Sequence, residues 1–432
     1  MRMTTDYKNT AAGRVPSEWD VVSLGQATTD IFGGGTPSTA KPTYWGGDIE
    51  WTTSAYLSGL HLKNGQRKIT KEGLDNSSSR LVPKGNLLVG TRVGVGKVAV
   101  NDVNVAISQD LTGLVLNKLA FDSEYLAYYL MSDQPQQVFR NQTRGTTIRG
   151  IPREDLKLIP VCRPPLPEQM KIAAILSKIQ QAIEVQEKII ERTKELKRGL
   201  MAKLFTEGLP AFRERDRQAG LHGEELKETE IGLMPKSWEV RRLGDIFDCH
   251  DGKRVPMTKA DRIAGPYPYY GASGIIDHVK DFIFDGEHLL VAEDGENLKS
   301  RKMPISFIAQ GKFWVNNHAH ILKNRLGSLK FYEQYMAQMD VKDYLTGTTR
   351  PKLTKGLLLE MRLPFPQETE QLEIGRVLER LDAKAKLNDI RLYLQSGIFK
   401  SMLYQLMAGH IRVNNIEIPF IGEQTGPAHV QA

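Results

Sequence analysis

The longest regular pattern of apolar and polar positions along the chain lies in two segments, at 164–208 and 364–412. In each segment apolar residues recur in alternating steps of three and four, which is the spacing of a coiled-coil seam. Prolines at the start of each segment (Pro164, Pro165 and Pro167; Pro364 and Pro366) end the preceding strand and place the helix start. A helix of about 40 residues spans about 60 Å. The pattern therefore predicts two long helices packed on each other, although two core helices of one globular domain remain an alternative.

The expected seam contains equivalent polar residues at its middle, Gln186 and Asn388, where such side chains fix the register of a coiled coil at a cost in stability. The seam residues are Ile172, Leu176, Ile179, Ile183, Gln186, Ile190, Leu200, Leu204, Ile374, Leu378, Leu381, Asn388, Leu392, Phe399, Met402 and Leu406.

An internal repeat extends beyond the helices. "GRVPSEWDVVSLG" from Gly13 matches "GLMPKSWEVRRLG" from Gly232, and "NLLVG" from Asn86 matches "HLLVA" from His288. "GTTIRG", which begins at 145, matches "GTTRPK", which begins at 347. The matches keep one order at offsets of about 200–220 residues, so they indicate a duplicated domain-plus-helix unit and not a solenoid of short repeats.

The expected fold class is α+β, with a pseudo-two-fold internal repeat. Short alternating apolar runs such as "LLVGTRVGVGKVAV" indicate strands and loops in each globular part. A strand-rich domain lies between the two helices in the sequence, so the helices can run antiparallel as a spacer between two globular domains. The expected divisions are a first domain at 1–163, a helix at 164–208, a polar linker at 209–230, a second domain at 231–363, a helix at 364–412 and a tail at 413–432.

Composition sets limits on the class of protein. The 432 residues suit two or three domains, and 40% hydrophobic with 25% charged residues is ordinary for a globular protein. The only cysteines, Cys162 and Cys249, lack metal-ligand spacing and fit a reducing cytoplasm. The N-terminus lacks a signal-peptide core, and no apolar run of about 18 residues predicts a membrane span. A net charge of +7 is compatible with a nucleic-acid partner if the basic residues gather on particular loops.

Several motifs resemble catalytic or metal sites without meeting their requirements. "GTRVGVGK" at 90–97 lacks the first glycine and the final hydroxyl of a phosphate-binding loop, which favours a hairpin with a basic tip. His318 and His320 face one side of an expected strand without further grouped ligands, and the acids of "VAEDGEN" at 291–297 are expected to be solvated. No nucleophile–base order, adenine-methyltransferase tetrapeptide or nuclease signature is found. We therefore expect no active site and no metal site.

Basic, hydroxyl-rich loops are the remaining candidates. Arginine can fork onto guanine in the major groove, threonine and lysine contact phosphates, and glycine lets the backbone approach a duplex. A plain turn into the next strand is the alternative for any single residue of these loops. The candidate DNA-binding residues are Arg92, Lys97, Arg144, Thr146, Thr147, Arg149, Lys253, Arg254, Thr348, Thr349, Arg350 and Lys352.

The sequence resembles the specificity subunit of type I restriction–modification systems over nearly its whole length. The phrases that carry the resemblance are "GGTPS…YWGGDIEW" (34–51), "GTRVGVGKVAV" (90–100), "PPLPEQMKIAAIL" (164–176), "TEIGLMPKSWEVRRLGDI" (229–246) and "LMAGHIRV" (406–413). One departure is the extra "QET" in "PFPQETEQ", which leaves the start of the second helix uncertain by a residue or two.

The resemblance implies a non-catalytic subunit with two target-recognition domains, each of which reads one half of a bipartite double-stranded DNA site. It implies that the helices set the half-site spacing and dock two methyltransferase subunits, with restriction subunits joining the full complex. S-adenosylmethionine, ATP and Mg are then expected on those partners and no cofactor on this chain. Two alternatives remain at this stage: the recognition subunit of a bifunctional type II system, and a coiled-coil scaffold that binds only protein.

Overall fold

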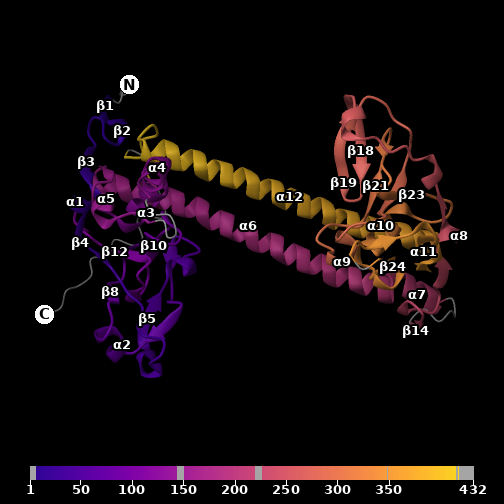
Figure 1. Ribbon diagram of the computed structural model, residues 1–432, viewed down its shortest axis with the longest axis horizontal. Helices are drawn as coiled ribbons and strands as arrows, with labels where there is room; N and C mark the ends of the chain where they lie inside the picture. Colours follow the sequence, from indigo (N-terminus) through magenta and orange to yellow (C-terminus); the bar gives the residue numbers. More distant parts are fainter. Residues whose placement is uncertain (1–5, 144–149, 219–225, 348, 415–416, 418–432) are drawn as a thin grey trace. The chain divides into compact units, whose positions relative to one another are not determined.

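The computed structural model describes residues 6–143, 150–218, 226–347, 349–414 and 417 (Figure 1). The chain divides into two compact units, one made of Met1–Gln186 and Arg391–Ala432, the other of Glu187–Ile390. Each unit therefore contains one globular domain and one half of each long helix. Among the described residues, none of the helices combines the length and apolarity needed to cross a bilayer.

The first unit is built on two mixed sheets. In the five-stranded sheet, of order β4-β12-β9-β10-β6, the buried faces of β9 and β12 pack against α3 and the start of α6. The four-stranded sheet has the order β7-β5-β11-β8, and two small pairs, β1-β2 and β13-β3, complete the unit.

The helices of this domain are short and capped. Asp122 accepts the Tyr125 N–H at the start of α3, and Ser23 forms a capping box with Gln26 at α1. The elements are β1 (Tyr7–Thr10), β2 (Gly13–Pro16), β3 (Asp20–Ser23), α1 (Leu24–Ala27), β4 (Thr28–Gly33), β5 (Trp45–Thr52), β6 (His61–Leu62), β7 (Arg67–Ile69), α2 (Lys71–Asp75), β8 (Arg80–Val82), β9 (Leu87–Gly90), β10 (Val98–Asn101), β11 (Val105–Ile107), β12 (Leu111–Leu116), α3 (Ser123–Met131), α4 (Asp133–Gln142), α5 (Arg153–Lys157) and β13 (Pro160–Arg163).

The second unit repeats part of this plan. Its four-stranded sheet has the order β17-β23-β20-β21, and a three-stranded sheet, β19-β18-β22, stands beside it. The elements are α7 (Pro210–Gln218), β14 (Leu226–Thr229), β15 (Gly232–Pro235), β16 (Glu239–Arg242), α8 (Leu243–Ile246), β17 (Phe247–Cys249), β18 (Ala264–Gly271), β19 (Gly274–Val279), β20 (His288–Ala292), α9 (Asn297–Ser300), β21 (Ser306–Ala309), β22 (Trp314–Val315), β23 (Ala319–Asn324), α10 (Leu329–Gln338), β24 (Leu345–Thr346), β25 (Lys352–Leu353), α11 (Lys355–Glu360) and β26 (Arg362–Phe365).

The repeat seen in the sequence is also a repeat of side-chain contacts. The Trp19 indole donates to Glu168 Oε2 at 3.1 Å, and the Trp238 indole donates to Glu370 Oε2 at 2.9 Å. In both units the glutamine that follows that glutamate accepts the backbone N–H at the N-cap of a helix: Asp122 for α3 and Ser328 for α10. Matched tryptophans and matched helix starts therefore fasten each globular domain to its long helix.

The long helices are α6 (Leu166–Glu207) and α12 (Glu368–Met407). In the first unit Ile172 and Leu176 of α6 share a core with Phe399 and Leu406 of α12. In the second unit Leu204 near the end of α6 shares a core with Ile374 and Leu378 near the start of α12. The start of one helix meets the end of the other, so the helices run antiparallel within each unit (Figure 1).

Every residue placed in the expected seam is buried or half-buried in the structure. At the polar middle of the seam, the Asn388 amide donates to Thr193 Oγ1 at 3.4 Å, and both side chains are buried. Lys197 pairs with Asp382 one turn away. By contrast, Ile189 and Leu196, which widen the apolar stripe, are exposed. The stripe is therefore broader than the surface that the two helices cover.

The stretch expected to be a polar linker, 209–230, contains regular structure in its described residues. It contains helix α7 and strand β14, and β14 pairs with β15 in the register that β1 and β2 use in the first unit. Strand pairing in the second unit therefore includes residues before 231. The signal was present in the sequence, because "DYKNTAAGRVP" at 6–16 and "ELKETEIGLMP" at 225–235 share Lys, Thr, Gly and Pro in one register.

The ends of the first unit are joined to each other. Tyr7 in strand β1 donates its hydroxyl to Gly409 O at 3.0 Å, just after α12. The Arg412 guanidinium contacts Glu168 at 2.8 Å and Glu18 at 3.0 Å. The two glutamates raise the pKa of Arg412, so this side chain stays charged at every relevant pH.

Candidate nucleic-acid interface

The same backbone hydrogen bond marks one corner of each globular domain. In the first domain Ile151 N donates to Thr91 O at 2.9 Å, just beyond the end of β9. In the second, Leu353 N donates to Glu293 O at 2.8 Å, just beyond the end of β20. The bond joins the stretch after each Gly-Thr-Thr motif to the end of the repeated "LLV" strand. Two motifs that stand about 60 residues apart in each copy therefore meet at one place.

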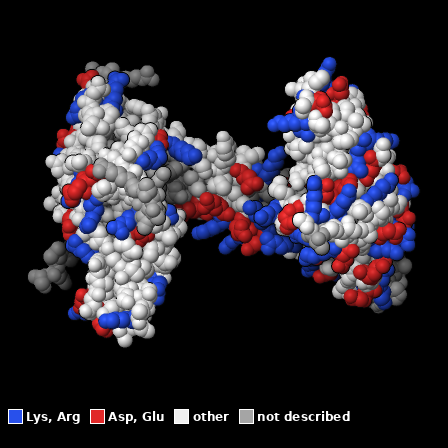
Figure 2. Space-filling model, in the orientation of Figure 1, with Lys and Arg blue, Asp and Glu red and all other residues white. Residues whose placement is uncertain are grey.

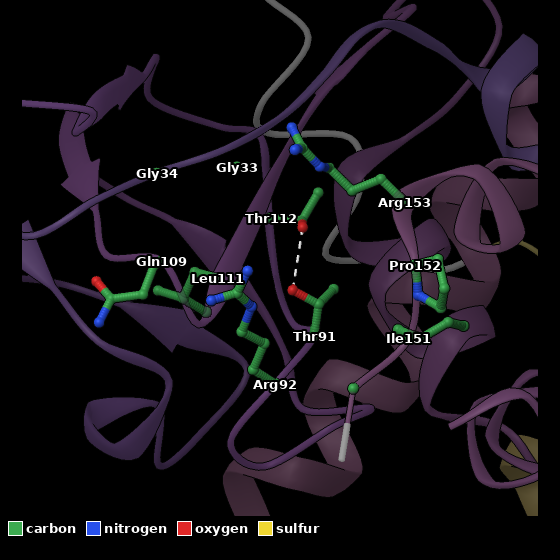
Figure 3. Close-up of a pocket in the computed structure, with 11 residues that line it drawn as sticks. Gly33, Gly34, Thr91, Arg92, Gln109, Leu111, Thr112, Ile151, Pro152 and Arg153 are labelled. Carbon is green, nitrogen blue, oxygen red and sulfur yellow. Dashed lines mark hydrogen bonds between the residues drawn. The ribbon is translucent and has the colours of Figure 1, made fainter. Parts of the chain in front are cut away.

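In the first domain this corner is an open pocket of about 620 Å³. Its floor is uncharged: Thr91 Oγ1 and Thr112 Oγ1 are 3.1 Å apart, and Gly33 lies beside them (Figure 3). Arg92 and Arg153 lie on either side of the threonine pair in this view. A pocket with a hydroxyl floor and guanidinium groups at its edge offers donors suited to phosphate oxygens and to guanine.

Close packing at Gly150 shapes this pocket. A Cβ atom on Gly150 would lie 2.8 Å from Thr91 O, so a side chain there would push the loop away from the strand. The absence of a side chain therefore lets the loop backbone lie directly against the end of β9.

The corresponding corner of the second domain is filled by charged side chains. Pairing along the repeat places Glu293 where Thr91 stands, His320 where Thr112 stands and Asp251 where Gly33 stands. His320 Nδ1 lies 2.6 Å from Asp251 Oδ2, and its Nε2 lies 2.8 Å from Leu353 O. Arg254 bonds Glu293 at 2.6 Å. Buried charges of opposite sign thus replace the hydroxyl floor.

The electrostatics of this network keep its carboxylates ionised. Burial acts to raise the pKa of Asp251, but the hydrogen bond and charge of His320, the Ile321 N–H and Arg254 hold that pKa below its ordinary value. Burial likewise opposes ionisation of Glu293, and bonds from Arg254 and Lys352 outweigh it and lower the pKa. The expectation that these acids are solvated is therefore wrong for Glu293, which is 9% exposed.

Cys249, Asp251 and His320 form the group of potential metal ligands found among the described residues, with ligand atoms within 4.8 Å of one another. Arg254 already contacts Asp251 at 3.4 Å, and both ring nitrogens of His320 have partners. Burial raises the pKa of the Cys249 thiol to about 11. The group is accounted for by its internal bonds, and we assign no metal to it.

The structure places the predicted DNA-binding residues in different settings. Arg92 lies exposed at the pocket edge, and Lys253 and Thr349 are exposed. Arg350 and Lys352 are exposed but paired, with Asp294 at 3.1 Å and Glu293 at 3.1 Å. Predictions for Arg144, Thr146, Thr147, Arg149 and Thr348 lie outside the described residues.

Two of the predicted DNA-binding residues, Arg254 and Lys97, have side chains that bond to other parts of the protein. The Arg254 side chain is 14% exposed and bonds Glu293, Asp251 and the Ala319 carbonyl. Lys97 donates to the carbonyls of Ser54 and Leu57 at 3.3 and 3.1 Å. In the sequence both side chains looked unpaired, because partners such as Glu293 for Arg254 and Leu57 for Lys97 lie about 40 residues away in the chain.

Three residues at these corners were missed: Gln109 and Arg153 in the first domain and Asp294 in the second. Arg153 and Gln109 lie outside the Gly-rich phrases that drew attention. Asp294 had a visible signal, since it aligns with Arg92 when "NLLVGTR" is set against "HLLVAED". Over the face of the second domain visible in Figure 2, Lys and Arg are interspersed with Asp and Glu. The charge there is paired and mixed, and it does not form one positive field.

Fold and site together define a recognition protein made of two divergent copies of one domain. The model for the type I restriction modification DNA specificity domain matches residues 16–195 and 235–393. The chain belongs to this family, and its role is that of a specificity subunit, which supplies recognition and not catalysis.

Full-length relatives share this organisation. The type I restriction enzyme MjaIX specificity subunit of Methanocaldococcus jannaschii is 25% identical over 96% of this chain and 98% of its own length. The EcoprrI specificity subunit of Escherichia coli is 26% identical over 82% of this chain and 85% of its own. A crystal structure of a type I restriction–modification S subunit from M. genitalium has the same fold, with a TM-score of 0.59, 18% identity and coverage of 94% of this chain and 98% of that one.

Proposed function

We propose that each globular domain reads one half of a bipartite duplex DNA site through the corner where its Gly-Thr-Thr loop meets the end of the "LLV" strand. The observation that carries this proposal is the same backbone bond in both domains, with different side chains around it. The shared backbone arrangement gives the two domains equivalent positions for contacting DNA. The different side chains at those positions give the domains different sequence specificities. Base edges are read by hydrogen bonds in the groove, so exchanged side chains at one frame position change the sequence that is read.

We further propose that two methyltransferase subunits dock on α6 and α12 and that restriction subunits join them. The support is a set of exposed apolar side chains on the helices, which the packing of each unit leaves uncovered. The set is Val185, Ile189, Leu196, Leu387, Ile390, Tyr393, Leu394 and Ile398. Exposed apolar surface of this kind is typical of protein interfaces. Neither the type II alternative nor the protein-only scaffold receives support from the relatives named above, which carry type I names.

In this arrangement the chain binds no cofactor of its own. S-adenosylmethionine is expected on the methyltransferase subunits, and ATP and Mg on the restriction subunits. The cytoplasmic location remains a prediction from the cysteine usage.

Methylated adenines in a genome test the function directly. A host that carries this chain with its methyltransferase should show one added bipartite motif with a fixed gap, and deletion of the chain should remove that motif. Methylation at a continuous site, or methylation that persists without this chain, would contradict the proposal. Purified complex should also lose duplex affinity steeply with salt, because phosphate contacts release counterions.

A further inference from the structure

Asp294 occupies the position at the corner of the second domain that Arg92 occupies in the first. It follows Glu293 at the end of β20 and forms an isolated antiparallel bridge with Lys352 across the corner. One oxygen, Oδ1, lies 3.1 Å from an Arg350 guanidinium nitrogen. The other, Oδ2, lies 2.9 Å from His318 Nδ1. The carboxylate therefore holds two side chains that come from different parts of the domain.

Exposure separates the roles of the two charged partners. The Arg350 side chain is 67% exposed, while that of Asp294 is 16% exposed. A guanidinium has five N–H donors in a rigid planar fork. The bond to Asp294 uses one nitrogen, Nη2, and leaves the rest of the fork facing solvent. The Asp294 carboxylate is the more enclosed of the two groups, so Arg350 is the one accessible to a ligand.

An unanchored arginine at this exposed position would lose considerable rotamer freedom on binding. This entropic cost weakens binding to every DNA sequence equally and does not increase the difference in affinity between them. An arginine fixed before binding meets only the base edge that matches its orientation. The carboxylate also offsets part of the positive charge that attracts any phosphate, so it lowers non-specific affinity. Both effects favour discrimination over simple attraction.

We propose that Asp294 is a positioning residue for sequence discrimination, which orients Arg350 toward a base of the second half-site. The two domains then deliver a guanidinium to equivalent corners in different ways. In the first domain Arg92 comes directly from the strand end. In the second, the strand end supplies the carboxylate, and the Gly-Thr-Thr loop supplies the arginine. This inference rests on the proposed reading of DNA by these corners.

The experiment uses the assembled methyltransferase complex with wild-type chain, Asp294→Asn, Arg350→Ala and the double variant. Binding is measured on three duplexes: the methylated motif found for this chain, one with an altered first half and one with an altered second half. Asp294→Asn should reduce discrimination at the second half-site about tenfold, in the range of one good bidentate base contact, and leave the first half-site unchanged. Its binding to the duplex with an altered second half should equal or exceed that of wild type, because a negative charge has been removed.

The double variant separates positioning from a general structural role. Once Arg350 is absent, Asp294→Asn should cause no further loss of discrimination. Asp285→Asn serves as the charge-matched control, since Asp285 is exposed in the same unit and should leave discrimination unaltered. Arg350→Lys should behave like Arg350→Ala in discrimination, because an ammonium lacks the planar fork.

An unchanged discrimination ratio in Asp294→Asn, additive losses in the double variant, or equal losses at both half-sites would overturn the role given to Asp294. Failure of the wild-type complex to discriminate at either half-site would instead overturn the proposed function. A lowered melting temperature with equal weakening on all three duplexes would mark a structural role and would likewise reject the inference.

Discussion

At the scale of single residues, several ionisable groups form hydrogen-bonded pairs within the protein. His61 shows this away from the proposed interface: Nδ1 lies 3.0 Å from Asp102 and Nε2 lies 3.5 Å from Glu124. The bond with Glu124 acts most strongly to raise the pKa of His61, burial opposes it, and Asp102 adds to it, for a value of about 9. The imidazole is therefore protonated in the folded state at neutral pH.

This pKa gives a prediction for pH. The folded pKa lies above the ordinary value of 6.5, so the stabilisation is fully present below about pH 6.5 and is lost as pH rises through about 9. His61→Gln should show a smaller fall in melting temperature over that interval than wild type. His278→Gln, at an exposed histidine, should follow wild type. Equal falls for His61→Gln and wild type would remove the role assigned to this histidine.

At the scale of elements, the start of each long helix is the joint of its unit. Glu168 in the first turn of α6 is 2% exposed and accepts hydrogen bonds from Trp19 and from Arg412. These bonds connect the start of α6 to the residue that precedes β3 and to the chain that follows α12. A carboxylate is also favoured at a helix N-terminus by the helix dipole. Glu370 in the first turn of α12 likewise accepts hydrogen bonds from the Trp238 indole and from the Leu209 N–H, just after the end of α6.

Loss of this carboxylate should be costly. Glu168→Ala leaves the Trp19 indole and the Arg412 guanidinium without their buried acceptor, so we expect a loss of about 3 kcal/mol in the free energy of unfolding of the first unit. Urea unfolding followed by tryptophan fluorescence would measure it. Glu154→Ala removes an 80% exposed carboxylate paired with Lys157 and should change stability by well under 1 kcal/mol. Similar small effects for both variants would show that the joint contributes little.

At the scale of the whole molecule, we propose that the long helices set the distance between the two half-sites that the domains read. One turn of B-DNA is about 34 Å, so contacts to successive grooves require a set spacing. Inserting one four-residue turn into α6 or α12 should change the gap of the methylated motif and leave both half-site sequences alone. Replacing four exposed helix residues without changing the length should leave the gap unchanged. A gap that stays constant after the insertion would refute the spacer role.

The sequence determined what depends on local periodicity and on comparison of the chain with itself. Three–four spacing predicted the long helices and the buried seam, and matched phrases such as those around Trp19 and Trp238 predicted the duplication. Both features could be predicted because helical periodicity depends on residues close together in the sequence and a duplication appears when the sequence is aligned with itself. The pairing of β14 with β15 was not predicted, because the weak match around Lys227 was not included.

Only the tertiary structure decided which cations are free. Arg254 and Lys97 resembled DNA contacts in the sequence, but distant carboxylates and carbonyls occupy them, while Arg153 and Gln109 enter the pocket from unremarked stretches. The same folding placed Asp294 beside Arg350, 56 residues further along the chain. The physical reason is that ion pairs and hydrogen bonds depend on distance in space, which periodicity does not encode, whereas helix faces and repeats depend on distance along the chain.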